Sequence, residues 1–198
     1  MAFKASVILR DKVRKAYSAA AERPDETHAF PVGRAFAESL GYPQELLASL
    51  PKISVEAFTG VSNVSLFSNI PEGATVLDLG CGAGFDSLIA ARRVGPAGRV
   101  LGFDFSYAML TRARRGAIEA TITNVVFCQA NAEELPLKES SVEIALASGI
   151  FNLNLARDAI FRELARVVRP GGSVYAAELI LSKPVPPEVR ASESNWFA

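Results

Sequence analysis

The sequence predicts an α/β fold with a doubly wound, mainly parallel sheet, N-terminal helices and a shortened C-terminal end. Strand-like and helix-like segments alternate from residue 75 onward, which implies right-handed crossovers and a buried parallel sheet. An Asp-bearing strand also runs directly into a glycine-rich turn at residues 80–84. Such a turn brings bare backbone N–H groups and a helix N-terminus to the carboxyl edge of a sheet, where open α/β folds bind ligands.

The first 70 residues predict helices that precede the sheet. The segment 7–22 is Ala-rich and amphipathic and ends before a proline. The segments 31–40 and 43–50 each begin at a proline, which favours a helix start, and each finishes beside a glycine or a proline.

The remaining chain predicts the layers of the sheet and its crossovers. Apolar, strand-forming runs predict strands over 75–79, 99–104, 124–129, 142–147 and 173–181. Helical periodicity predicts helices between them over 85–94, 106–120 and 155–168. We therefore expect an N-terminal helical cap over 1–70, a ligand-binding domain over 71–184 and a tail over 185–198.

The C-terminal end is short after the fifth predicted strand. Three prolines follow it closely and disfavour another strand start. We expect either a truncated domain or a fifth strand that remains an exposed edge. The apolar stretch 174–177 on such an edge invites pairing, so we hypothesise a homodimer through this edge or through exchange of the C-terminal segment.

Length and composition predict one enzyme-sized domain without a nucleic-acid or membrane partner. A chain of 198 residues with 49% hydrophobic residues can bury a proper core. The 21 basic and 21 acidic residues cancel, and no apolar run approaches the length of a bilayer span. Charged residues interrupt the amino end, and the two cysteines stand in unrelated contexts, so we expect a cytoplasmic location.

The glycine turn does not match the dinucleotide fingerprint. Gly80, Gly82 and Gly84 alternate, and Phe85 stands where that fingerprint needs its last glycine. The carboxylate of Asp78, just before the turn, would repel a pyrophosphate. It suits instead a ligand that carries an ammonium or a sulfonium group, or it caps the loop amides.

A second acid ends the next predicted strand. Asp104 follows Gly84 by twenty residues, the position from which a carboxylate accepts hydrogen bonds from ribose hydroxyls. The alternative role, capping of the following helix, is better served by Ser106.

In order and spacing these motifs, together with 131–136 and the segment 164–172, resemble the class I S-adenosylmethionine-dependent methyltransferases over about residues 60–184. The resemblance implies a Rossmann-like methyltransferase fold, S-adenosylmethionine as cofactor and transfer of a methyl group to a small-molecule acceptor. It implies a cofactor site formed by Tyr17, Asp78, Gly80, Cys81, Gly82, Asp104, Phe105, Met109, Asn131, Ala132, Glu133 and Ser148.

Several of these roles have alternatives. Asn131 stands where most members have an Asp that accepts from the adenine amino group, which an amide oxygen can also do. The backbone N–H of Ala132 would meet the adenine ring. Phe105 or Met109 would pack on the purine, with a core role as the alternative for Met109. Tyr17 either lies near the methionine carboxylate or is a packing aromatic.

Within this family, the sequence most resembles the arsenite methyltransferases, but the cysteines that their chemistry needs are missing. Those enzymes hold arsenic with several cysteines outside the glycine loop, one of them where Gly149 stands here. This chain has only Cys81, inside the loop, and Cys128, in a predicted buried strand. Two cysteines and one histidine also fall short of a metal site. Arsenic methylation and a metal centre are therefore not expected.

The catalytic residues and the acceptor stay open. The sole histidine, His28, reads as a surface residue, and Asn152 as an acceptor contact or a loop cap. An alternative function is a protein that binds S-adenosylmethionine or S-adenosylhomocysteine without transfer and acts through a partner. A nicotinamide-dependent oxidoreductase is disfavoured by Phe85 and by the lack of a Tyr-x-x-x-Lys pair.

Overall fold

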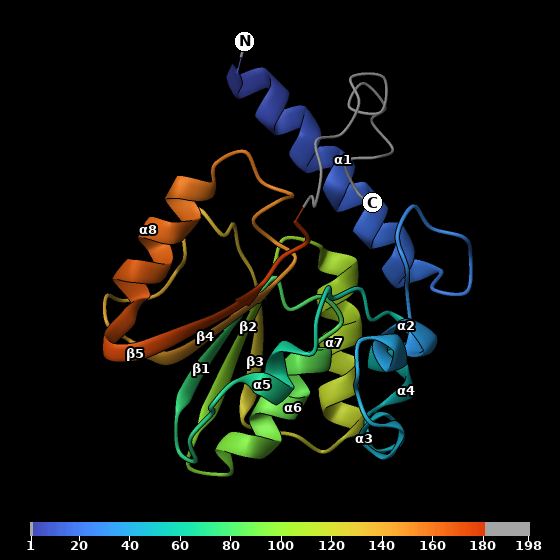
Figure 1. The fold of residues 1–198 in the computed structure, drawn as a ribbon, viewed down its shortest axis with the longest axis vertical. Coiled ribbons are helices and arrows are strands. Elements are labelled where there is room, and N and C mark those ends of the chain that lie inside the picture. The colour runs from blue at the N-terminus through green and yellow to red at the C-terminus, as the bar shows by residue number, and fades with distance from the viewer. Residues whose placement is uncertain (1, 181–198) are drawn as a thin grey trace.

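A five-stranded parallel sheet organises the computed structural model, which describes residues 2–180, with side chains from residue 8 onward. The strand order is β3-β2-β1-β4-β5, so the chain winds outward from β1 in both directions (Figure 1). This confirms the predicted doubly wound sheet. The strands are β1 (Thr75–Leu79), β2 (Arg99–Asp104), β3 (Val125–Gln129), β4 (Val142–Ser148) and β5 (Val168–Ala177).

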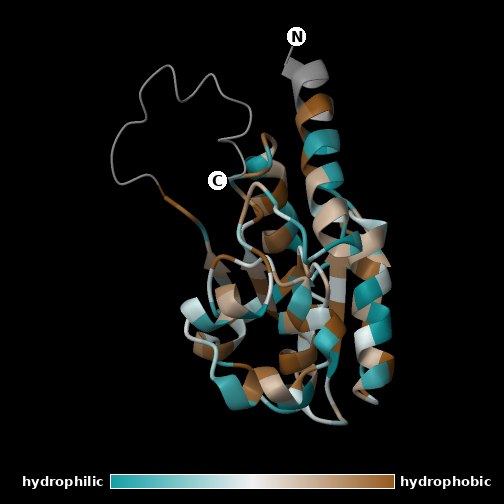
Figure 2. Ribbon diagram, turned by 90° about the vertical axis from the view of Figure 1, so that its right-hand side faces the viewer, coloured by the Kyte–Doolittle hydropathy of each residue, from teal (hydrophilic) through white to brown (hydrophobic). Residues whose placement is uncertain are grey.

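Helices cover both faces of the sheet. α8 (Arg157–Val167) lies on one face, and α6 (Phe85–Val94) and α7 (Tyr107–Glu119) lie on the other (Figure 1). The helices carry hydrophobic and hydrophilic residues in alternation, as helices between a core and water must (Figure 2). The central strand β1 is buried on both sides, with Val76 and Leu77 fully inaccessible to water. The switch in winding direction lies between β1 and β4, the place where such sheets bind ligands.

The helices before the sheet pack mainly against α6 and α7. They are α1 (Ala2–Glu22), α2 (Arg34–Ser39), α3 (Gln44–Ser49), α4 (Lys52–Glu56) and α5 (Val64–Phe67). Arg112 of α7 ties two of them in place, since its guanidinium donates to the carbonyl oxygens of Ala21 and Ile53. α4 and α5 were not predicted, because helices of five and four residues are too short to show a periodicity.

β5 differs from its predicted range. It begins at Val168 rather than at residue 173, and it includes the Pro170-Gly171-Gly172 stretch that reads as a turn. Its pairing with β4 shifts register between Val142 and Ile144, which accommodates this stretch. Among the described residues β5 pairs with β4 alone, and Val174 on it is 44% exposed. The predicted strand end at residue 181 and the tail over 185–198 lie outside the described residues.

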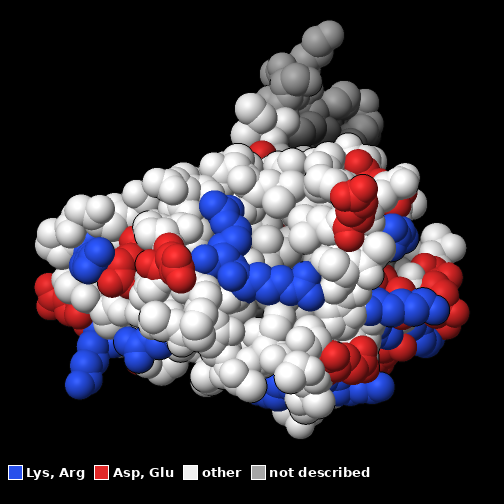
Figure 3. All heavy atoms as spheres, turned by 90° about the horizontal axis from the view of Figure 1, so that it is seen from below, with Lys and Arg blue, Asp and Glu red and all other residues white. Residues whose placement is uncertain are grey.

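The face of the molecule seen from below carries charges of both signs (Figure 3). Seen from below, lysines and arginines alternate with aspartates and glutamates, without a face of one sign (Figure 3). None of the helices within residues 2–180 combines the length and apolar character that a bilayer span requires.

Candidate functional site

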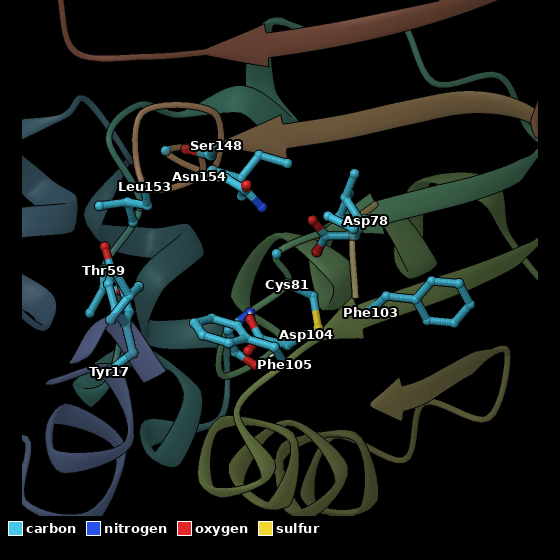
Figure 4. Close-up of a pocket in the computed structure, with 18 of the residues that line it drawn as sticks. Tyr17, Thr59, Asp78, Cys81, Phe103, Asp104, Phe105, Ser148, Leu153 and Asn154 are labelled. Carbon is cyan, nitrogen blue, oxygen red and sulfur yellow. Dashed lines mark hydrogen bonds between the residues drawn. The ribbon is translucent and has the colours of Figure 1, made fainter. Parts of the chain in front are cut away.

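A cavity opens at the carboxyl ends of β1, β2 and β4 (Figure 4). Its free space is about 1080 Å³ when the open mouth is included. Eleven of the twelve residues predicted to bind the cofactor line it, and Met109 does not. These eleven come from positions 17–148, so the fold gathers what the sequence spreads over most of its length.

The glycine turn forms one side of this cavity. Gly80, Gly82 and Gly84 have φ angles of 75°, 52° and 78°, a region that side chains rarely adopt. The N–H of Gly80 donates to the carbonyl oxygen of Phe103 over 2.8 Å and fixes the turn against β2. A Cβ on Gly80 would lie 2.3 Å from Cγ2 of Ile150. The turn therefore packs closely against the loop after β4, and only glycine fits there.

Asp78 is a buried carboxylate at the base of the turn. Its side chain is 5% exposed, and its Oδ2 accepts a hydrogen bond of 2.5 Å from the Ser87 hydroxyl. It thus bonds to α6 rather than capping the loop amides. Burial, and next the negative charge of Asp86, raise the pKa of Asp78 to about 7. A cation placed beside it would reverse that shift.

Asp104 joins the end of β2 to the glycine turn. Its Oδ2 accepts from the N–H of Gly82 over 2.9 Å and its Oδ1 from the N–H of Ser106 over 2.7 Å. Ser106 caps α7, as the sequence indicated, by accepting from the N–H of Met109. Burial raises the pKa of Asp104 to about 6, although these N–H donors lower it. Each carboxylate oxygen keeps a second lone pair for a ligand hydroxyl.

The loop after β3 lines another side of the cavity. Asn131, Ala132 and Glu133 all face it, and Glu133 Oε1 accepts a hydrogen bond of 2.8 Å from the amide of Asn154. This bond links the loops that follow β3 and β4 across the sheet edge. Phe105 also lines the cavity, beside Asp104 (Figure 4).

Met109 is a correction to the predicted site. Its side chain is fully buried in a small core with Ala20, Ala21 and Phe30. As the third residue of α7, it packs against Ala20 and Ala21 of α1, and its sulfur lies 3.9 Å from where a Cβ on Gly82 of the glycine turn would be. The core role, which the sequence left open as the alternative, is the one that the structure supports.

Tyr17 and Ser148 lie on the side opposite the glycine turn, with Thr59, Leu153 and Asn154 (Figure 4). Tyr17 stacks on Phe30 with ring centroids 4.5 Å apart, so it both packs and faces the cavity. Burial, and next the charge of Asp104, raise the pKa of Tyr17, which keeps its hydroxyl protonated. Ser148 Oγ accepts from the N–H of Val61 over 3.1 Å and holds the 57–61 loop at the cavity wall.

Sequence reasoning missed several residues of the cavity. Thr59, Leu153 and Asn154 sit in loops without a motif, and Arg10 and Val13 are two of many α1 residues. Asp86 had a usable signal, because it is an acid two residues after the last glycine of the turn.

His28 and Asn152, the two other residues that the sequence singled out, lie outside the cavity lining. The ring of His28 contacts the carbonyl oxygen of Arg23. The side-chain amide of Asn152 donates to the carbonyl oxygen of Leu179.

The two cysteines do not converge. Cys81 lines the cavity, whereas Cys128 does not and is half-buried rather than buried as predicted. Burial raises the pKa of the Cys81 thiol, which disfavours the thiolate that would bind a soft metal or arsenic. Within the described part of the chain, no group of three or more histidine, cysteine or acidic side chains is arranged to hold a metal ion.

Comparison with known proteins identifies the family. The methyltransferase domain family matches residues 70–197, and the chain belongs to it. The chain is 34% identical over 166 residues to an arsenite methyltransferase of Halobacterium salinarum, covering 84% of this chain and 41% of that protein. It is 37% identical over 124 residues to the ubiquinone/menaquinone biosynthesis C-methyltransferase of Hahella chejuensis, covering 62% and 49%.

Solved structures agree with this family and with the predicted Rossmann-like methyltransferase fold. An arsenic(III) S-adenosylmethionine methyltransferase from Chlamydomonas reinhardtii superposes with a TM-score of 0.63 at 27% identity, covering 85% of this chain and 57% of that one. An S-adenosylmethionine-dependent methyltransferase from Aquifex aeolicus gives a TM-score of 0.53 at 27% identity, covering 61% and 65%. Family membership implies S-adenosylmethionine as the cofactor. The chain spans less than half the length of the two sequence relatives named above.

Proposed function

We propose that this chain binds S-adenosylmethionine in the cavity and transfers its methyl group to a small-molecule acceptor. The observation that carries the proposal is the meeting of three features at one sheet edge. These are a glycine turn that leaves no room for a Cβ at Gly80, the buried carboxylate of Asp104 and the loop at Asn131. The relatives are named as methyltransferases, which does not favour a binding protein without transfer.

The proposed contacts follow from where each group lies. Asp104 accepts from the ribose hydroxyls, and Asp78 faces the cationic amino-acid end. Asn131 and the N–H of Ala132 meet the adenine edge, while Tyr17 and Ser148 border the mouth. The other proposed contacts, all lining the cavity, are Gly80, Cys81, Gly82, Phe105 and Glu133.

The chemistry places few demands on the protein. When bound, the cofactor supplies an electrophilic methyl group on a positively charged sulfur. The side chains then have to orient an acceptor and exclude water, and orientation of this kind contributes about 7–11 kcal/mol in favourable cases. Thr59, Leu153 and Asn154 on the wall opposite the glycine turn are uncharged and offer no base. We therefore favour an acceptor that is soft or loses its proton readily to water.

Thiolate-held arsenite is not the acceptor we propose. The named relatives include arsenite and quinone-type methyltransferases. Only Cys81 reaches the cavity, and burial raises its pKa. A quinol-type or other small organic acceptor needs no such thiolate.

Three further expectations belong to this proposal. Residues 1–70 act as a cap over the 71–184 domain, supported by Arg10, Val13 and Tyr17 at the cavity wall. The exposed edge of β5 supports a homodimer, which light scattering at high protein concentration tests, since a monomeric mass contradicts it. The unpaired cysteines support a cytoplasmic location, which cell fractionation tests.

Calorimetry and product analysis test the main proposal. We expect micromolar binding of S-adenosylmethionine and release of S-adenosylhomocysteine when a panel of quinols, thiols and amines is supplied. Binding without turnover on the whole panel would favour the binding protein. NADH binding without any effect of S-adenosylmethionine would contradict the proposal.

A further inference from the structure

Asp86 is a buried acid in the cavity whose role no sequence motif explains. It is the second residue of α6, where acidic side chains commonly face water and offset the helix dipole. Here, however, the carboxylate is only 8% exposed and lines the cavity. A carboxylate buried without a countercharge is costly, so its position calls for a partner.

The N-terminal helices hold this carboxylate in place. The hydroxyl of Tyr42, which follows α2, donates to Asp86 Oδ1 over 2.6 Å. Tyr42 is itself wedged edge-on against Phe58 and Phe85, at centroid distances of 5.4 and 4.8 Å. Phe58 and Phe85 both line the cavity. A buried aromatic cluster thus aims one hydroxyl at one carboxylate, which indicates a built arrangement rather than a solvated acid.

Asp86 lies near Asp78, because both line the cavity and Ser87, the residue after Asp86, donates to Asp78 Oδ2. The charge of Asp86 is the largest contribution after burial to the raised pKa of Asp78. Burial raises the pKa of Asp86, and the hydrogen bond from Tyr42 opposes that rise. The Ser65 hydroxyl has no partner within hydrogen-bond distance, so Tyr42 is the close side-chain donor.

Among the residues that the structure describes, no lysine or arginine forms an ion pair with either acid. Each carboxylate receives one hydroxyl donor, Ser87 at Asp78 and Tyr42 at Asp86. Two buried carboxylates that line one cavity and each keep acceptor capacity match the chemistry of an ammonium group, which has three N–H donors and a positive charge.

We propose that Asp86, positioned by Tyr42, forms with Asp78 a two-carboxylate site for the ammonium group of the cofactor's amino-acid end. The inference rests on the proposed function, since it deepens the role of the same cavity. It also gives the N-terminal region a defined task. Tyr42 lies 44 positions before Asp86, and it couples the helices that precede the sheet to the charge of the ligand site.

Ligands that differ only in the amino-acid end test this site. S-adenosylmethionine and S-adenosylhomocysteine carry the ammonium group, whereas 5′-methylthioadenosine keeps the adenosine and lacks it. Calorimetry with the full chain should show that Asp86→Asn weakens binding of the first two ligands about tenfold, as loss of one charge-assisted hydrogen bond predicts. Binding of 5′-methylthioadenosine should change less than about twofold. If Asp86 had only a structural role, its replacement would weaken binding of this ligand as well.

Two further variants keep the test decisive. Tyr42→Phe preserves the aromatic cluster and removes only the hydroxyl, so it serves as the test if Asp86→Asn does not fold. It should weaken binding of the two ammonium ligands about threefold. Asp158→Asn, an exposed acid in the first turn of α8, is the matched control and should change nothing.

Equal losses for all three ligands in Asp86→Asn would overturn the two-carboxylate site, as would unchanged affinity for S-adenosylmethionine. If the unaltered chain binds none of the three ligands, the proposed function itself fails, and this inference with it.

Discussion

The two sides of the cavity are built in different ways. The side formed by the glycine turn, Asp78 and Asp104 comes from one continuous stretch of β1, α6 and β2, and it carries the buried charges. The opposite side comes from α1, the 57–61 loop and the 149–154 loop, and its contacts are mostly uncharged. We propose that the first side recognises the cofactor, while the second decides which acceptor enters.

The largest expected effect tests how closely the two sides meet. Gly80→Ala places a Cβ at 2.3 Å from Ile150, which belongs to the loop on the other side, and forces alanine to a φ of 75°. We expect a loss of about 2–4 kcal/mol in the free energy of unfolding, from backbone strain and overpacking together. Urea denaturation measures it.

Gly73→Ala is the matched control for that change. Gly73 also has a positive φ, 79°, but a Cβ there meets nothing within 4 Å. It should lose only about 1 kcal/mol, the cost of the backbone conformation. Equal losses at Gly73 and Gly80 would show that the contact between the two sides is unimportant.

The next effect concerns the charged side alone. Asp104→Ala removes the proposed ribose acceptor and the partner of the Gly82 N–H. We expect S-adenosylmethionine binding to weaken by about 1–3 kcal/mol, since the lost hydrogen bonds involve a charged group. Calorimetry measures this affinity, and an unchanged value would remove the ribose assignment.

The pH dependence of binding tests the same charges without a mutation. Asp78 and Asp104 have pKa values raised from the ordinary 3.8 to about 7 and about 6. Without a ligand, the folded protein holds these protons more tightly than the unfolded chain does. The stability that these groups contribute is therefore greatest near pH 4 and below, and it is lost as pH rises through 6–7.

Cofactor binding should show the opposite trend, because a cationic ligand favours charged carboxylates. We expect affinity to be highest near pH 7–8 and to fall by up to about tenfold per pH unit below 6, as the carboxylates gain protons. It should fall again above about pH 8, as the α-ammonium group of the cofactor loses its proton. Calorimetry from pH 5.5 to 8.5 follows it. A flat profile would contradict a cation beside Asp78.

The smallest expected effect lies on the uncharged side. Tyr17→Phe keeps the ring stacked on Phe30 and removes the hydroxyl. We expect a loss of about 0.5–1 kcal/mol in S-adenosylmethionine binding if that hydroxyl contacts the cofactor. Unchanged binding with altered turnover would instead place Tyr17 on the acceptor side of the comparison.

Local patterns were enough to predict the strands and helices of the charged side. The helix ranges 85–94 and 106–120 agree with α6 and α7 to within about one residue, because their caps, Gly84 and Ser106, are read directly from the sequence. The start of β5 and the short helices α4 and α5 escaped prediction, since their form depends on packing against β4, α6 and α7.

The site was predictable to the same extent. Asp78 and Asp104 each follow a strand-forming run, so their place at the sheet edge is a consequence of the sequence period. The core position of Met109 could not be decided from the sequence, because a methionine in the first turn of a helix can contact either a ligand or a neighbouring helix such as α1.

The sequence alone determined the parallel sheet, the glycine turn and the acids at the strand ends, since each follows from residues that are neighbours in the chain. Only the tertiary structure decided that Tyr42 bonds to Asp86 and that Tyr17, Thr59 and Asn154 share one wall. These contacts join segments tens of residues apart, and their energy comes from packing that no local pattern encodes.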